Sequence, residues 1–145
     1  MSTIEGVLAE LVRKSLGELE RAVLATPDGV VIAASNPSDV DDIVAALGAA
    51  VVAGVGEAFR QYFESGVKDV LVELNDGRVV LLRELRENVL CLISKSEPNL
   101  GLIYYILGKY EQKIAEAAVK ATPLDAGGGA AAAASPSRGV EGREK

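Results

Sequence analysis

The 145-residue chain contains no histidine and no tryptophan, and it has a single cysteine and a single methionine. Without histidine, it lacks the usual general base at neutral pH and the commonest zinc ligand. A single cysteine excludes a disulfide within the chain and any metal site built from several cysteines. We therefore expect no catalytic constellation, no metal and no cofactor, and we interpret the chain as a non-catalytic protein.

Signals for phosphate binding and for targeting are missing as well. The sequence has no GxxxxGK[ST] loop, and no GxGxxG follows a strand pattern. Its first residues, MSTIEGVLAELVRK, lack the basic-then-apolar order of a signal peptide. The longest apolar run has 14 residues, fewer than the roughly 20 that span a bilayer. We expect a cytoplasmic protein with no direct membrane insertion.

Basic residues are in the minority, with 15 Lys and Arg against 21 Asp and Glu and a net charge of −6. Nucleic acids and anionic lipids are bound by clustered Lys and Arg, so we expect no nucleic-acid partner. Hydrophobic residues make up 49% of the chain, which suffices for one packed domain. We place this domain at residues 1–120. Residues 121–145 are rich in Gly, Ala, Pro and Ser, and we expect a disordered tail there.

The most informative feature present is the run IVAALGAAVVAGVG at residues 43–56, which has no polar side chain. A helix that is apolar on every side must be covered on every side. At about 100° per residue, larger side chains such as Ile43, Leu47 and Val51 fall on one side, and we assign them to the core. This pattern predicts a homodimer. The smaller side chains fall on the other side, where we predict contact with a second copy of the chain: Ala45, Ala49, Val52, Ala53 and Gly56.

The rest of the pattern predicts the order helix, two strands, helix, three strands, helix. Turns such as Pro27-Asp28-Gly29 join neighbouring strands in antiparallel hairpins. The segment 89–93 is apolar on both faces, which is typical of a central strand covered above and below. We predict an α+β fold, a five-stranded antiparallel sheet with helices on both faces. Apolar spacing places the elements at residues 3–15, 21–26, 30–35, 39–64, 67–74, 79–85, 89–94 and from 96–99 onward.

Several clusters have both a structural and a functional interpretation. The acidic residues at 39, 41 and 42 could form a metal site, but aspartates at a helix start also bind its free N–H groups, and we favour capping by Ser38 or Asp39. The glycines at 48, 54 and 56 are interpreted as permitting close helix packing, and Cys91 as a core residue. The aromatic residues are assigned mainly to core and edge packing, with a binding patch as the alternative: Phe59, Tyr62, Phe63, Tyr104, Tyr105 and Tyr110.

Several segments together resemble the Roadblock/dynein light chain family. They are the hairpin AVLATPDGVVIAAS, the Ala-rich long helix, the NDGR turn, and the strand Leu-Cys-Leu-Ile that leads into Asn99-Leu100-Gly101-Leu102. The resemblance covers about residues 3–118 and implies a profilin-like or longin-like sheet. It also implies homodimers in which the third strands pair edge to edge and the long helices pack antiparallel. Such proteins serve as platforms or regulators of Ras-like small GTPases, or as adaptor subunits of motor and trafficking complexes.

A dimer needs a second contact, because the helix face alone hides on the order of 400 Å², worth roughly 10 kcal/mol gross. Association itself costs roughly 4–15 kcal/mol. An unpaired strand edge is a template for its own copy, so we predict that the strand at 67–74 supplies this contact. Its charged residues have an alternative interpretation as protection of the edge against such pairing. The predicted edge residues are Asp69, Val70, Leu71, Val72 and Glu73.

The leading hypothesis is a homodimeric regulator or scaffold that binds a Ras-like small GTPase. An activating partner can insert an arginine that neutralises charge in the transition state. One alternative is a structural adaptor subunit of a larger complex that does not affect GTP turnover. A more remote one is a small-molecule sensor or enzyme that holds its ligand between sheet and helix. We favour a solvated surface position for the nominal arginine candidates, which are Arg60, Arg78, Arg83 and Arg86.

Overall fold

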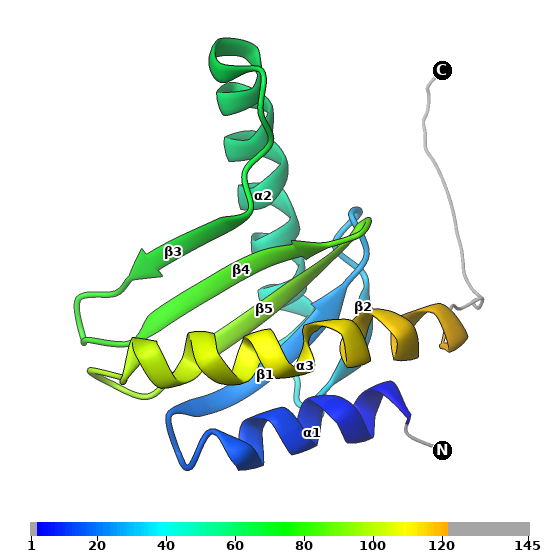
Figure 1. Ribbon diagram of the computed structural model, residues 1–145, viewed down its shortest axis with the longest axis vertical. Coiled ribbons are helices and arrows are strands. Elements are labelled where there is room, and N and C mark those ends of the chain that lie inside the picture. Colours follow the sequence, from blue (N-terminus) through cyan, green and yellow to red (C-terminus); the bar gives the residue numbers. More distant parts are fainter. Residues whose placement is uncertain (1–2, 122–145) are drawn as a thin grey trace.

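The computed structural model describes residues 3–121, which form a five-stranded antiparallel sheet with helices on both faces (Figure 1). This arrangement confirms the predicted fold class and element order. The predicted tail at 121–145 lies outside the described residues except for Ala121. The elements are α1 Ile4–Lys14, β1 Leu19–Ala25, β2 Val31–Ala34, α2 Asp41–Phe63, β3 Asp69–Glu73, β4 Val79–Leu85, β5 Asn88–Ser94 and α3 Leu100–Lys120.

The strands are arranged in the order β2-β1-β5-β4-β3, so β5 is central and β2 and β3 form the two edges. Helices α1 and α3 cover one face of the sheet, and α2 crosses the other (Figure 1). The side chains of β5 therefore alternate between two cores, as its two apolar faces predict. Leu90 and Leu92 pack with α1 and α3, whereas Val89 and Cys91 pack toward α2.

The helix ends differ from the predicted ones by a few residues. Thr3 caps α1 with its side chain, which accepts a hydrogen bond from Gly6 N. Asn99 caps α3 with its side chain, and α3 begins at Leu100, directly after the predicted start at 96–99. Helix α2 ends at Phe63, one residue before the predicted end at 64, and its C-cap Glu64 has a left-handed φ of 56°. These shifts leave the order and pairing of the elements unchanged.

Helix α2 lies close to the sheet at Gly48. A Cβ atom at this position would lie 2.5 Å from the Sγ of Cys91 and 3.3 Å from a methyl group of Leu82. This confirms that Gly48 permits close packing. At Gly54 and Gly56, however, nothing lies within 4 Å of the place that a Cβ atom would occupy, so packing inside the protomer does not explain these two glycines.

We expect Gly48→Val to lower the free energy of unfolding by about 2 kcal/mol, within the usual cost of overfilling a packed core. The reason is that Cys91 is fully buried and cannot move away from the new side chain. Gly108→Val is the matched control, because the space beside Gly108 in α3 is open and its effect should stay within about 0.5 kcal/mol. Urea unfolding measures both variants, and equal effects would contradict the close contact.

Candidate functional site

Four residues of α2 lie on the opposite side of the helix contact from the prediction. Two of its small residues pack on the protein's own sheet: Ala45 is 0% exposed and Ala49 is 5% exposed. Of the larger residues assigned to the core, Ile43 and Leu47 face away from the sheet and are 61% and 62% exposed, whereas Val51 is half-buried and packs against the core beneath α2. The assignment of Ala45 and Ala49 to a subunit interface is therefore wrong, whereas that of Gly56 stays a prediction because nothing in the protomer lies within 4 Å of the place of its Cβ atom. Small side chains on the sheet-facing side let the helix backbone approach the strands closely.

The two other predicted helix residues lie at the margin of this contact. Val52 is half-buried and packs against the core beneath α2, whereas Ala53 is exposed. Their contact with a second copy stays a prediction. A charge at Ala49, in contrast, would be buried in the protomer's own core, so Ala49→Glu would unfold the chain rather than separate two copies.

The sheet-facing stripe of α2 continues beyond the sheet. Positions 45, 49, 52, 56, 59 and 63 are three or four residues apart and therefore share one side of the helix. The last two are phenylalanines in the part of α2 that extends past the β3 edge (Figure 1). Phe59 is 48% exposed and Phe63 is 69% exposed, and their rings stack with centroids 5.7 Å apart. The assignment of these rings to core packing is therefore wrong for the protomer.

Strand β3 forms an uncovered edge beside this overhanging end of α2. It pairs only with β4, so its outer edge has no partner strand within residues 3–121. Val70 packs toward the α2 side of the sheet, and Val72 follows it with the same orientation. Leu71 is 40% and Val72 is 37% exposed, so apolar side chains are uncovered on both faces of the edge. Glu73, the last predicted edge residue, is exposed.

A buried arginine ties β3 to the rest of the fold. Arg83 on β4 is 6% exposed, and its guanidinium donates hydrogen bonds to both carboxylate oxygens of Asp69 at 2.6 and 2.8 Å. It also donates to Glu111 on α3 at 3.1 Å. The hydrogen bonds to Asp69 raise the pKa of Arg83 above its usual value. The interpretation of Arg83 as a surface residue is therefore wrong, and Asp69 has a structural role in holding the edge strand.

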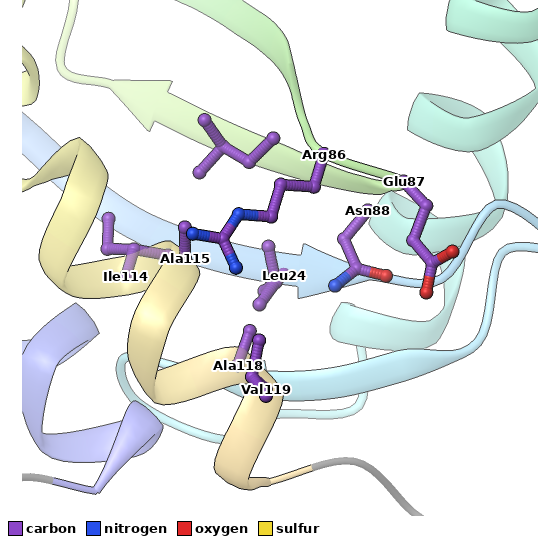
Figure 2. A pocket seen from close by; sticks show the side chains of 9 residues that line it. Leu24, Arg86, Glu87, Asn88, Ile114, Ala115, Ala118 and Val119 are labelled. Atoms are coloured by element: carbon purple, nitrogen blue, oxygen red, sulfur yellow. The ribbon is translucent and has the colours of Figure 1, made fainter.

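A pocket lies on the opposite face of the sheet, between the β4–β5 hairpin, β1 and the C-terminal half of α3 (Figure 2). Its volume is about 350 Å³. Arg86 extends over its mouth in Figure 2. The remaining predicted arginines form exposed ion pairs, Arg60 with Glu57 and Arg78 with Asp76.

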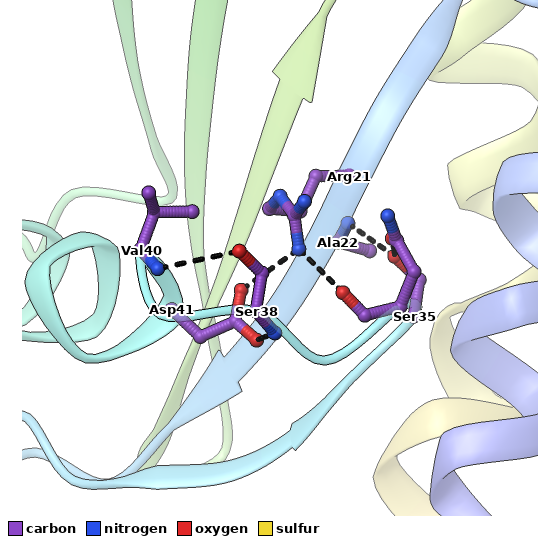
Figure 3. A network of polar contacts seen from close by, with 7 residues as sticks. Arg21, Ala22, Ser35, Ser38, Val40 and Asp41 are labelled. Carbon is purple, nitrogen blue, oxygen red and sulfur yellow. Dashed lines mark hydrogen bonds and ion pairs between the residues drawn. The ribbon is translucent and has the colours of Figure 1, made fainter.

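Helix α2 begins at Asp41, and the preceding Val40 makes no side-chain cap, so the predicted capping by Ser38 or Asp39 is wrong. Instead, the Asp41 carboxylate accepts hydrogen bonds from Ser38 N at 2.8 Å and from Arg21 Nη1 at 3.0 Å (Figure 3). The ion pair joins the start of α2 to β1. Within residues 3–121, no group of three acidic or Cys side chains could hold a metal ion.

The Cys91 thiol is buried under α2, and burial raises its pKa from 9.0 to about 12. We expect iodoacetamide to leave the native protein unmodified at pH 8 and to alkylate Cys91 once urea unfolds the chain. The unfolded chain loses this proton near pH 9 and the folded chain near pH 12, so the associated stability falls as pH rises through that window. Mass spectrometry measures the modification, and rapid native labelling would contradict the buried position.

Helix α2 is also long and apolar enough to cross a membrane, judged by length and composition alone. It has 23 residues, more than the 14-residue apolar run from which membrane insertion was excluded. Only 22% of its most apolar stretch is buried inside the protein. Ala45 and Ala49 pack on the sheet, so a spanning helix would have to leave this core. The absence of membrane insertion stays a prediction.

The geometry is thus a sheet with one open edge, crossed by a long helix that overhangs it. The sequence matches the Roadblock/LC7 domain over residues 5–94, more than half of the chain. The chain belongs to the Roadblock/LC7 family. Members of this family are in general regulatory or adaptor proteins rather than enzymes. The predicted resemblance is confirmed.

Solved structures share the Roadblock/LC7 fold at low sequence identity. A Roadblock/LC7 domain from Streptomyces avermitilis is 20% identical, with a TM-score of 0.71 over 78% of this chain and 95% of that chain. MglB from Myxococcus xanthus is 17% identical, with a TM-score of 0.70 over 82% and 90%. An MglB structure with a tetrameric arrangement is 18% identical, with a TM-score of 0.67 over 83% and 94%. No curated protein matches the chain.

The two features of this Roadblock/LC7 protein that the sequence reasoning missed are the overhanging phenylalanines and the buried Arg83. A signal for the first was present, because Phe59 and Phe63 continue the three- and four-residue spacing of the small residues. Arg83 had a weaker signal. On its strand, Arg83 lies on the same buried face as Leu81 and Leu85, and a charged side chain on such a face needs a partner of opposite charge.

Proposed function

We propose that this protein is a homodimeric regulator or scaffold that binds a Ras-like small GTPase. The observation that carries the proposal is the apolar surface of α2 and β3 that the protomer leaves uncovered, in a chain of the Roadblock/LC7 family. Monomeric proteins rarely expose large contiguous apolar patches, and those that do use them for association. The surface has two parts, which point in different directions and fit two different partners.

The first part fits a second copy of the chain. If the outer edge of β3 pairs antiparallel with the same edge of its copy, the sheet continues across a twofold axis perpendicular to it. The overhanging end of α2 then lies over the partner's sheet. Phe59 and Phe63 point toward that sheet, because they share the side of α2 that faces its own sheet. The partner offers Val72 and Val80, which pair across β3 and β4 on this face and are incompletely covered.

The energy of this contact is of the same order as the cost of forming a dimer. Burying a phenylalanine completely stabilises by about 1.5–3 kcal/mol. With exposed fractions of 48% and 69%, the four rings of two copies contribute about 4–7 kcal/mol gross. The hydrogen bonds of the paired β3 edges add to this sum, at about 0.5–1.5 kcal/mol each. Their sum is comparable with an association cost of about 4–15 kcal/mol.

The second part of the surface fits the GTPase. Ile43 and Leu47 point away from the sheet, so continuation of the sheet leaves them exposed. Val40, at the start of the same helix, is 45% exposed and extends this patch. The twofold axis would bring the patches of both copies to one side of the dimer. A shared apolar platform of this kind suits a protein partner that contacts both copies at once.

Purified small GTPases from the same genome, loaded with GDP or a GTP analogue, test this proposal. We expect the chain to bind one of them, and Leu47→Glu to abolish that binding while the dimer persists, because Leu47 lies outside the proposed dimer contact. Hydrolysis rates separate a regulator, which changes them, from an adaptor, which binds without changing them. Absence of binding in both nucleotide states would overturn the proposal.

A further inference from the structure

We propose that the pocket beneath Arg86 binds a small organic anion, an apolar group that ends in a carboxylate. The pocket lies on the face of the sheet opposite to α2 (Figure 2). It therefore takes no part in the dimer or in the GTPase platform, and the inference is independent of both.

The shape of the pocket suits a small apolar group. Its volume of about 350 Å³ is within the range of roughly 300–1,000 Å³ that is usual for small-molecule sites. Leu24 and Ile114 at its floor are 0% exposed, and Leu85 is 5% exposed, so the floor is rigid core. Ala115 and Ala118 form a smooth wall on α3. All polar side chains of the lining come from one side, the hairpin turn at residues 86–88.

The Arg86 guanidinium supplies a charge without a partner. Four other arginines within residues 3–121 form ion pairs with carboxylates, but the Arg86 side chain makes no hydrogen bond or ion pair there. In Figure 2 it extends over the pocket toward Ala115, and the Glu87 carboxylate points away from the floor. A guanidinium binds a carboxylate through two parallel hydrogen bonds. The Asn88 side chain beside it offers a further donor.

The backbone at Arg86 is strained, which supports a role for this side chain. Its φ is 57°, in the left-handed region that two-residue hairpin turns usually fill with glycine or asparagine. Within residues 3–121 no hydrogen bond or ion pair of the Arg86 side chain compensates for the energetic cost of this backbone conformation. Leu16, Glu64 and Glu97 share this conformation, but of the four only Arg86 lines the pocket. Strained backbone is enriched at functional sites.

Titration with octanoate, followed by amide NMR shifts of the full chain, tests the inference. We expect saturable shifts at Ala115 and Asn88, and weaker binding of octanol, which lacks the carboxylate. Arg86→Gln should weaken octanoate binding at least tenfold and leave octanol binding unchanged. Arg13→Gln is the matched control, because Arg13 is an exposed arginine on α1 outside the pocket, and its affinity for octanoate should equal that of the native chain.

A second variant separates binding from folding. Arg86→Gly removes the guanidinium and relieves the left-handed strain, so it should raise the melting temperature while it abolishes octanoate binding. Three results would overturn the inference: no saturable shift at millimolar octanoate, equal affinity of the native and Arg86→Gln chains, or shifts confined to the exposed face of α2.

Discussion

Phe63→Glu is expected to separate the dimer into monomers and to leave the stability of the protomer within about 0.5 kcal/mol of its original value. The side chain is 69% exposed in the protomer, so a carboxylate is well solvated there. In the proposed dimer the same position faces the partner's Val72 and Val80, where a carboxylate would lose its water and find no cation. We expect dimer affinity to fall at least 100-fold, which is about 3 kcal/mol.

Tyr62→Glu is the matched control for this variant. Tyr62 is adjacent in sequence and even more exposed, at 85%, but it lies on a different side of α2 from Phe59 and Phe63. We expect it to change dimer affinity by less than about tenfold. Sedimentation equilibrium gives both affinities, and urea unfolding gives the stabilities. Equal effects of Phe63→Glu and Tyr62→Glu would show that the sheet-facing stripe does not contact the partner.

Arg83→Met is expected to lower the free energy of unfolding by about 3–5 kcal/mol, the usual effect of removing one member of a buried ion pair. Arg83 is 6% exposed and bonds to Asp69 and Glu111, on β3 and α3. Its removal leaves the Asp69 carboxylate partly buried without a cation. Because Asp69 belongs to the edge strand, the variant should also weaken the dimer, although Arg83 itself does not face the edge.

Arg78→Met supplies the comparison for the buried pair. Arg78 bonds to Asp76 at 2.9 Å, but both side chains are about half exposed, and exposed pairs contribute about 0–1 kcal/mol. The double variant Arg83→Met with Asp69→Leu should recover most of the stability lost in Arg83→Met, because it removes the unpaired carboxylate. Urea unfolding measures all three variants. An Arg83→Met effect below that of Arg78→Met would contradict the buried pair.

The elements of this fold could be predicted from the sequence because local patterns determine them. The strands were predicted from alternating apolar residues and from turns such as the one at 75–77. The central position of β5 was predicted from its two apolar faces. The orientation of α2 could not be predicted in the same way. When a helix is apolar on every side, its periodicity does not tell which side meets the sheet. That choice depends on Gly48 and Cys91, which are far apart in the sequence and meet only in the folded chain.

The candidate site was predicted in part. Strand β3 lies at an edge of the sheet, as pairing with a second copy requires. The pairing itself stays a prediction. The buried state of Arg83 was not predictable from composition, because its partners come from a neighbouring strand and from α3. The overhang of α2 was missed because helix length relative to sheet width is a property of the assembled layers.

The mass of the native protein in solution tests the central claim most directly. The chain has a mass of 15.1 kDa, and sedimentation equilibrium of the purified protein at micromolar concentration should give twice this value. The Phe63→Glu chain, measured beside it, should give the mass of a single chain. A native protein that sediments as one 15.1 kDa chain, with Phe59, Phe63 and the β3 edge open to water, would contradict the account.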